Sequence, residues 1–156
     1  MDSTERKKLF AWGRNDNGQT GVKETDKVCI PTDITSGFGF KTPRGFSSVS
    51  AGKVHSGVVL TDGYCYTWGG NELGQLGVEN IEKNTSSPQY VVELSQPVAK
   101  IACGYTQTAF LMHDGSLMIC GHNDSGQLGV EDNSEIIDVP IPVRDLDEEI
   151  AVVTCS

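Results

Sequence analysis

The chain has 156 residues, about the length of one domain and enough to bury a core. Hydrophobic residues make up 37% and charged residues 21%, a balance that argues against a disordered segment. The net charge of −9 argues against direct nucleic-acid binding, and no apolar run reaches the roughly 18 residues of a membrane-spanning helix, so we expect no membrane insertion.

Glycine is enriched, with 18 residues spread along the chain, which favours many turns between short elements. In chain order the first clear element is a glycine-rich block, WGRNDNGQTGV, over residues 12–22. It returns as WGGNELGQLGV over 68–78 and as CGHNDSGQLGV over 120–130, and six of its eleven columns are identical in all three copies. The copies lie 56 and 52 residues apart, so the chain is an internal repeat.

Each later copy of the block follows a predicted β-hairpin. Residues 58–60 and 64–68 are short β-rich runs on either side of the Asp-Gly pair at 62–63, and the arrangement recurs around the pair at 114–115. An Asp-Gly pair between such runs indicates a hairpin, because both residues tolerate a positive φ.

Further short runs complete each unit. One follows a proline, at 89–92 and again at 141–143, and another precedes a pair of small residues, at 99–102. No stretch of about ten residues or more has the periodicity of an amphipathic helix. About four short strands per unit predict an all-β protein built from β-propeller blades, each of four short antiparallel strands.

The repeat resembles the regulator of chromosome condensation repeat. The match is carried best by four segments of the second unit: Ala51-Gly52, His55-Ser56, Leu60-Thr61-Asp62-Gly63 and Trp68 to Gly77. The self-similarity covers nearly the whole chain, and the resemblance implies a β-propeller, commonly of seven blades in that family. Members of the family include a nucleotide exchange factor for a small nuclear GTPase, ubiquitin ligases, cilia proteins and plant photoreceptors, so the fold alone does not give the function.

The chain holds about three blade lengths, which predicts an incomplete ring. Lys7 aligns with Gly63, so the first unit lacks the strands that precede this position. The favoured interpretation is an N-terminal piece of a longer propeller, and self-association through open blade edges is the alternative. We expect one partial β-propeller over residues 1–156, with repeat units at approximately 1–50, 51–102 and 103–156.

The repeated residues are expected to be structural. Trp12 and Trp68 should pack in the core, and Cys120 holds the equivalent position in the third unit. His55 should form a structural hydrogen bond, because Gln107 holds the equivalent position in the next unit. The structural repeat positions are Trp12, Gly13, Asn15, Gly18, Gly21, Gly52, His55, Trp68, Gly69, Asn71, Gly74, Gly77, Gly104, Cys120, Gly121, Asn123, Gly126 and Gly129.

No catalytic, cofactor or metal site is expected. The five cysteines contain no CxxC pair, the three histidines have no ligand spacing, and the glycine-rich blocks lack the Lys-Ser/Thr of a P-loop. The N-terminal sequence MDSTERKKLF does not resemble a signal peptide, so we expect a cytoplasmic or nuclear location, or both, with buried structural thiols.

The first connection between units is the best candidate for binding a partner. It is four residues longer than the others, since Val22 to Val49 spans 27 positions against 23 in the later units. Phenylalanine and arginine here are residue types common at or near interface hot spots, although the rings could instead fold back onto the blade. The candidate partner-binding residues are Phe38, Phe40, Arg44 and Phe46.

Charge is unevenly distributed along the chain. Residues 1–53 carry a net charge of +3, residues 54–129 carry −5 and residues 130–156 carry −7. The acidic end is either a solvated face or a surface that attracts a basic partner. Its candidate partner-binding residues are Asp145, Asp147, Glu148 and Glu149.

A non-catalytic protein–protein interaction scaffold is the function that these observations favour. The alternative, from the family resemblance, is a guanine-nucleotide exchange factor or another regulator of a small GTPase. Such a factor needs no nucleophile, because it would bind the nucleotide-free GTPase more tightly than the loaded form. The expected partner is therefore a protein, with a small GTPase as one candidate class.

Overall fold

The computed structural model describes residues 7–23, 25–39, 45–81, 83–144, 146 and 149–155. Apart from one turn of 3₁₀ helix, η1 (Thr35–Phe38), the regular elements of these residues are short strands. In chain order the strands are β1 (Phe10–Arg14), β2 (Lys27–Asp33), β3 (Phe46–Ala51), β4 (His55–Leu60), β5 (Cys65–Gly70), β6 (Asn84–Tyr90), β7 (Val98–Cys103), β8 (Gln107–Met112), β9 (Leu117–His122) and β10 (Ile136–Pro142).

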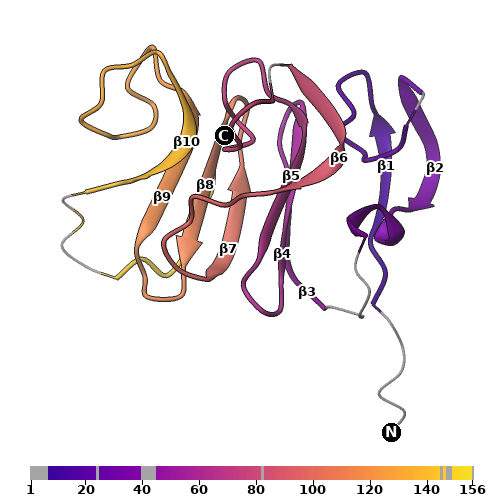
Figure 1. Cartoon of the computed structure of the whole chain (residues 1–156), viewed down its shortest axis with the longest axis horizontal. Helices are drawn as coiled ribbons and strands as arrows, with labels where there is room; N and C mark the ends of the chain where they lie inside the picture. Colours follow the sequence, from indigo (N-terminus) through magenta and orange to yellow (C-terminus); the bar gives the residue numbers. More distant parts are fainter. Residues whose placement is uncertain are drawn as a thin grey trace, which may run out of the picture.

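The strands form three antiparallel sheets that follow one another in an open arc (Figure 1). Two of them have four strands each, in the orders β3-β4-β5-β6 and β10-β9-β8-β7, and the first sheet pairs β1 with β2 alone. The prediction of an all-β chain of four-stranded propeller blades is confirmed. The complete sheets begin at Phe46 and Val98, a few residues before the sequence units, because a repeat can be divided at any phase.

The hairpins predicted at the Asp-Gly pairs are present, but only the glycine of each pair has a positive φ, not the aspartate as well. In the turn between β4 and β5, the Gly63 N–H donates to Leu60 O over 2.9 Å, and the Leu60 N–H donates to Tyr64 O over 2.8 Å. Gly63 has a φ of 85°, a region open to glycine at little steric cost. The turn at Gly115, with a φ of 82°, repeats this arrangement. Local sequence therefore sets the two central strands of each complete blade.

The outermost strands lie earlier in the chain than the sequence indicates. The predicted strand at 89–92 is β6, which ends at Tyr90 and contains Pro88. The predicted strand at 141–143 is likewise β10, which ends at Pro142. A proline can lie inside β6 because β6 is an edge strand, where the missing N–H does not interrupt a ladder between two strands.

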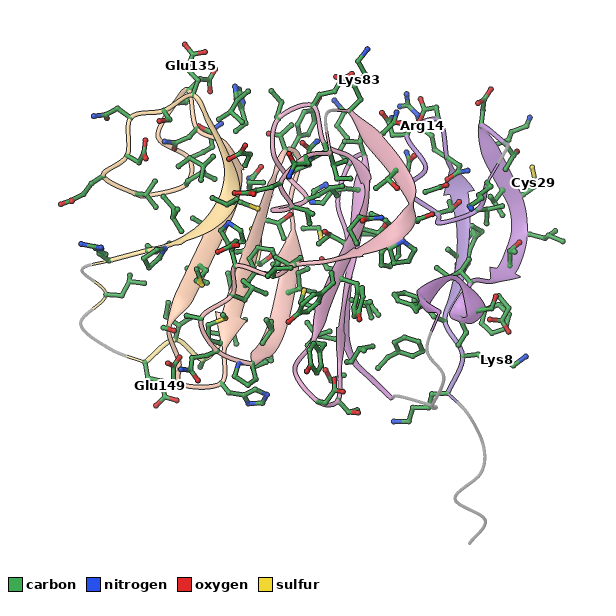
Figure 2. The ribbon with its side chains drawn as sticks, in the orientation of Figure 1. Lys8, Arg14, Cys29, Lys83, Glu135 and Glu149 are labelled. Carbon is green, nitrogen blue, oxygen red and sulfur yellow. The ribbon has the colours of Figure 1, made fainter. Side chains whose placement is uncertain are left out.

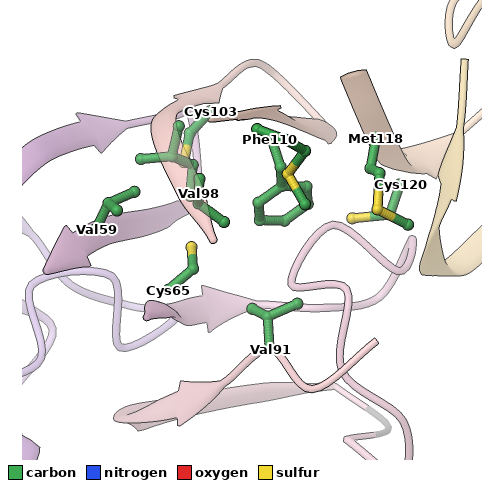
Figure 3. Packing of buried hydrophobic residues seen from close by; sticks show 10 residues of the cluster. Val59, Cys65, Val91, Val98, Cys103, Phe110, Met118 and Cys120 are labelled. Atoms are coloured by element: carbon green, nitrogen blue, oxygen red, sulfur yellow. The ribbon is translucent and has the colours of Figure 1, made fainter. Parts of the chain in front are cut away.

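The core lies between neighbouring blades as well as within them. Figure 3 shows Val59 and Cys65 of the second sheet facing Val98 and Phe110 of the third, and all four are fully or almost fully buried. Ile101 of β7 packs against Gly57 of β4, where any larger side chain would collide with it. Adjacent sheets therefore share one apolar layer. Among the residues that the structure describes, no helix is long and apolar enough to cross a membrane.

Candidate partner-binding surface

Each glycine-rich block forms a loop that a buried asparagine holds in place. In the second unit, Asn71 is 6% exposed, and its Oδ1 accepts the backbone N–H of Leu76 over 2.9 Å. Its Nδ2 donates to Ile81 O, on the far side of the loop. The same Oδ1 bond joins Asn15 to Thr20 over 2.9 Å and Asn123 to Leu128 over 3.2 Å. The loops thus share a framework that does not depend on their exposed side chains.

The first two of these loops also join their sheets to the next one. The backbone carbonyl of Gln19 accepts from Ser56 Oγ over 2.8 Å and from Trp68 Nε1 over 3.0 Å. One unit later, the carbonyl of Gln75 accepts from Thr108 Oγ1 over 2.6 Å. Since these donors belong to the following sheet, the first and second loops each have a fixed position relative to that sheet.

The loops share one edge of the arc, and their charges change along it. In Figure 2, Arg14, Lys83 and Glu135 follow each other along this edge, while Lys8 and Glu149 lie at the opposite edge. The sequence contains no lysine or arginine between residues 101 and 143, so the third loop is acidic without a basic residue of its own. The edge therefore presents different chemistry at each unit.

Charge at the first loop is largely balanced within the loop. The Arg14 guanidinium donates to both carboxylate oxygens of Asp16, with Nε distances of 2.9 and 2.8 Å. This hydrogen bond is the main reason that the pKa of Asp16 is lowered to about 2. In the third loop, Asp132 Oδ1 accepts the Ser134 N–H over 2.8 Å, and hydrogen bonds from Ser134 lower the pKa of that carboxyl. Asp132 therefore stays ionised beside the exposed Glu131.

Hollows lie between a loop and the outermost strand of the next sheet, and the residues that line them differ. The hollow between the first loop and β6 has a volume of about 360 Å³, and its lining includes Asp16 and Asp26. The hollow between the second loop and β10 has a volume of about 250 Å³ and is lined in part by Ile81 and Ile136, the latter 44% exposed. Equivalent positions thus offer a polar hollow at one junction and a partly apolar one at the next.

The long first connection folds partly into the blade. Phe38 is 8% exposed, and its ring lies 5.8 Å from Phe46, 5.8 Å from Tyr66 and 5.6 Å from Trp68 between centroids. Of the two alternatives that the sequence leaves open, Phe38 follows the second and folds back onto the blade instead of forming a surface contact, because burying its ring in this aromatic cluster removes apolar area from water. Phe46 is half-buried against the same cluster, and Glu149 is exposed. The remaining candidates lie outside the described residues: Phe40, Arg44, Asp145, Asp147 and Glu148.

The two tryptophans of the repeat differ in their surroundings. Trp68 is 3% exposed, because it packs between its own sheet and the loop of the preceding unit. Trp12 is 62% exposed, so the expectation of core packing is wrong for this residue. Cys120, in the third unit, is fully buried beside Gln75 O. Burial in this column depends on the neighbouring unit, and no preceding unit lies beside Trp12 among the described residues.

Three buried thiols belong to the core. Burial raises the pKa values of Cys65, Cys103 and Cys120, that of Cys103 to about 12, so these thiols stay protonated and unreactive. Cys29 is exposed. Within the described ranges, no three His, Cys, Asp or Glu side chains gather in a way that could hold a metal ion.

Successive four-stranded antiparallel sheets, each with one asparagine-held glycine loop, define a β-propeller repeat protein. The family profile of the Regulator of chromosome condensation (RCC1) repeat matches residues 8–59 and 62–111, and a second profile of this repeat matches 46–75 and 98–127. The chain belongs to the RCC1 repeat family.

Alignments with known proteins cover most of the chain. It is 32% identical over 148 residues to the secretion-regulating guanine nucleotide exchange factor of Mus musculus, which covers 95% of this chain and 31% of the relative. It is 32% identical over 130 residues to the protein RCC2 homolog of Xenopus laevis, covering 83% of this chain and 25% of the relative.

The fold is also that of a solved structure. The crystal structure of Prp20p from Saccharomyces cerevisiae, described with its binding to Gsp1p and histones, superposes with a TM-score of 0.85 at 20% identity. The superposition covers 97% of this chain and 38% of Prp20p. The chain therefore spans well under half the length of each of these proteins.

Proposed function

We propose that this chain is a non-catalytic protein-binding part of an RCC1-repeat propeller, and that its binding surface is the edge formed by the three glycine-rich loops. One observation carries the proposal: the loops share a buried asparagine framework, while the exposed residues on that framework differ in charge and polarity. Loops held on a rigid scaffold can vary their side chains without loss of the fold, which suits recognition of a protein surface.

The acidic third loop, between β9 and β10, is the part of this surface with the most distinct charge. Glu131 and Glu135 are exposed, and this segment of the sequence has no lysine or arginine with which to pair. Clustered charge of one sign speeds association with a partner of opposite sign and disfavours partners of the same sign. We expect a basic patch on the partner.

The experiment compares charge reversals at two places. The full chain, the double variant Glu131→Lys/Glu135→Lys and the control Glu93→Lys would be immobilised and exposed to cell extract, and the captured proteins quantified. Glu93 is exposed and lies outside the loops, so its reversal should leave capture unchanged. A protein lost only with the double variant supports the proposal. Equal capture by all three chains would refute the loop edge as the binding surface.

A second candidate function is nucleotide exchange on a small GTPase. It is favoured by the relative from Mus musculus, which is named as a guanine nucleotide exchange factor, and by the reported binding of Prp20p to Gsp1p. Exchange requires tighter binding of the nucleotide-free GTPase than of the loaded form, and this difference drives release. Release of fluorescent nucleotide from a panel of small GTPases tests it: faster release at micromolar chain supports exchange, and binding without faster release leaves the scaffold function.

A further inference from the structure

The hollows beside the first and second loops are built on the same backbone frame. At the first, a Cβ added to Gly18 would lie 2.9 Å from the Cα of Ser86 in β6. At the second, a Cβ added to Gly74 would lie 2.8 Å from the Cα of Asp138 in β10. Each loop thus meets the outermost strand of the next sheet by the same close backbone approach, which only glycine allows.

Two equivalent positions in these hollows differ in polarity. Thr25 and Asn84 line the first hollow, and Ile81 and Ile136 line the second. The carbonyls of Thr25 and Ile81 each accept from Nδ2 of the buried asparagine of their own loop. Asn84 and Ile136 each pair with the last residue of the neighbouring strand, β5 and β9 respectively. A polar pair at the first junction is therefore replaced by an aliphatic pair at the second.

The aliphatic pair leaves apolar surface in contact with water. Ile136 is 44% exposed, Ile81 is half-buried, and half-buried Val78 lies in the same lining. Covering such surface with an apolar group is favourable. The volume of about 250 Å³ lies below the roughly 300–1,000 Å³ of small-molecule pockets, so the second hollow suits a single side chain of a protein partner.

Carboxylates surround this aliphatic pair. Glu72 and Asp138 are exposed and belong to the lining of the second hollow. Glu135, exposed at the edge of the arc, directly precedes Ile136 (Figure 2). Lys83 is also exposed but does not line the hollow. An apolar floor with acidic sides favours an apolar residue that has basic neighbours, and it disfavours one with acidic neighbours.

We propose that the second hollow is the specificity pocket of the loop edge, and that it receives one aliphatic side chain of a protein partner, flanked by lysine or arginine residues. This inference rests on the proposed function, because it names what the loop edge recognises in its partner. The first hollow, with its polar pair, does not select an aliphatic residue. Recognition is thereby assigned to one junction of the repeat.

The experiment titrates the isotope-labelled intact chain with two end-blocked peptides, GKKLKKG and GKKSKKG, and follows its backbone amides by nuclear magnetic resonance. The leucine peptide should shift the amides of Ile81 and Ile136 saturably. It should bind about tenfold more tightly than the serine peptide, because its leucine is removed from water in the hollow. Equal affinity for the two peptides, or shifts confined to other parts of the chain, would overturn the proposal.

Chain variants locate the pocket. The double variant Ile81→Thr/Ile136→Asn gives the second hollow the residues of the first, on a frame that already accommodates them, and should bind both peptides equally. Ile136→Asn alone is the milder variant and should lose most of the preference. Ile30→Thr is the matched control, because Ile30 is 71% exposed and lies outside the lining, and it should keep the preference. A preference that survives the double variant would place the leucine elsewhere.

The charge reversal Glu131→Lys/Glu135→Lys separates this inference from the proposed function. If the reversal weakens binding of both peptides while neither is preferred, the loop edge binds basic partners and only the pocket is refuted. If the reversal changes nothing and no amide of the loops shifts, the loop edge fails as a binding surface and the pocket fails with it. Loss of binding on reversal, together with a leucine preference that the double variant removes, supports both.

Discussion

Acid should destabilise this protein through His55 before its carboxylates are protonated. His55 is fully buried in β4, with Nε2 2.7 Å from Thr108 Oγ1. The threonine hydrogen is donated to Gln75 O over 2.6 Å, so Nε2 carries the proton and donates to the hydroxyl oxygen. Burial lowers the pKa of His55 to about 4, because a second proton would place an unsolvated charge in the core.

The sign and size of the effect follow from linkage. An unfolded histidine has a pKa of about 6.5, so between about pH 4 and 6.5 the unfolded state binds more protons than the folded state. The free energy of unfolding therefore falls as the pH drops through this window. At about 1.36 kcal/mol per pKa unit, His55 removes about 2 kcal/mol at about pH 5 and about 3 kcal/mol at about pH 4, relative to pH 7.

The assay is urea unfolding of the intact chain at pH values between about 7 and 4, followed by tryptophan fluorescence, in which the buried Trp68 reports the loss of the core. His55→Gln is the informative variant, because Gln107 already occupies this column in the next blade and glutamine does not titrate in this range. It should lose much of the acid dependence of the wild type. His113→Gln, at an exposed position, is the control and should keep it.

The pKa of Asp16 and that of Asp33 are lowered to about 2 by their hydrogen bonds, so these carboxylates lose their stabilising effect only as the pH falls below about 4. Both carboxylates are present in the wild type and in the two variants, so their protonation contributes equally to all three chains. If wild type and His55→Gln lose the same stability between about pH 7 and 5, His55 accepts its proton in the folded state at an ordinary pKa, and the reasoning fails.

The remaining predictions use pairs of equivalent positions. Trp68→Ala should cost about 3–5 kcal/mol of unfolding free energy, and Trp12→Ala, at a 62% exposed residue, less than about 1 kcal/mol; equal losses in urea titrations would contradict the burial difference. Gly74→Val should abolish soluble expression, because its Cβ would lie 2.8 Å from a backbone atom of β10. Gly126→Val has open space around its Cβ and should cost only the strain of a φ of 70°, about 1–3 kcal/mol of unfolding free energy, measured by thermal melting. A thiol reagent should modify exposed Cys29 well before the buried cysteines, and simultaneous modification would indicate a loosely packed core.

The strands and turns of the complete blades could be predicted because their causes are local. The Asp-Gly pair at 62–63 and its counterpart at 114–115 specify hairpins through backbone conformation, which needs no distant partner. The asparagine of each block bonds to its own loop, as Asn71 does to Leu76. Because the same local arrangement occurs in each unit, each copy of the repeat supports the prediction made from the others.

Burial in the repeat could not be predicted from one column of residues. Trp12 and Trp68 hold the same position in the repeat, yet one is exposed and the other buried, because the indole packs on the preceding unit. Phe38 packs against Phe46 of β3 and against Tyr66 and Trp68 of β5, all distant from it in the sequence. Contacts between units depend on which sheets are adjacent, and the residue type at one repeat position does not reveal this.

The sequence by itself thus determined the fold class, the number of blade lengths and the position of each hairpin and loop, because glycine, asparagine and Asp-Gly pairs act on the backbone nearby. The tertiary structure decided which repeated residues are core and which are surface, that the outermost strands run through their prolines, and that, among the described residues, β1 pairs with β2 alone. The reason is physical: backbone conformation is a local property, whereas burial is a property of the pair of surfaces that meet.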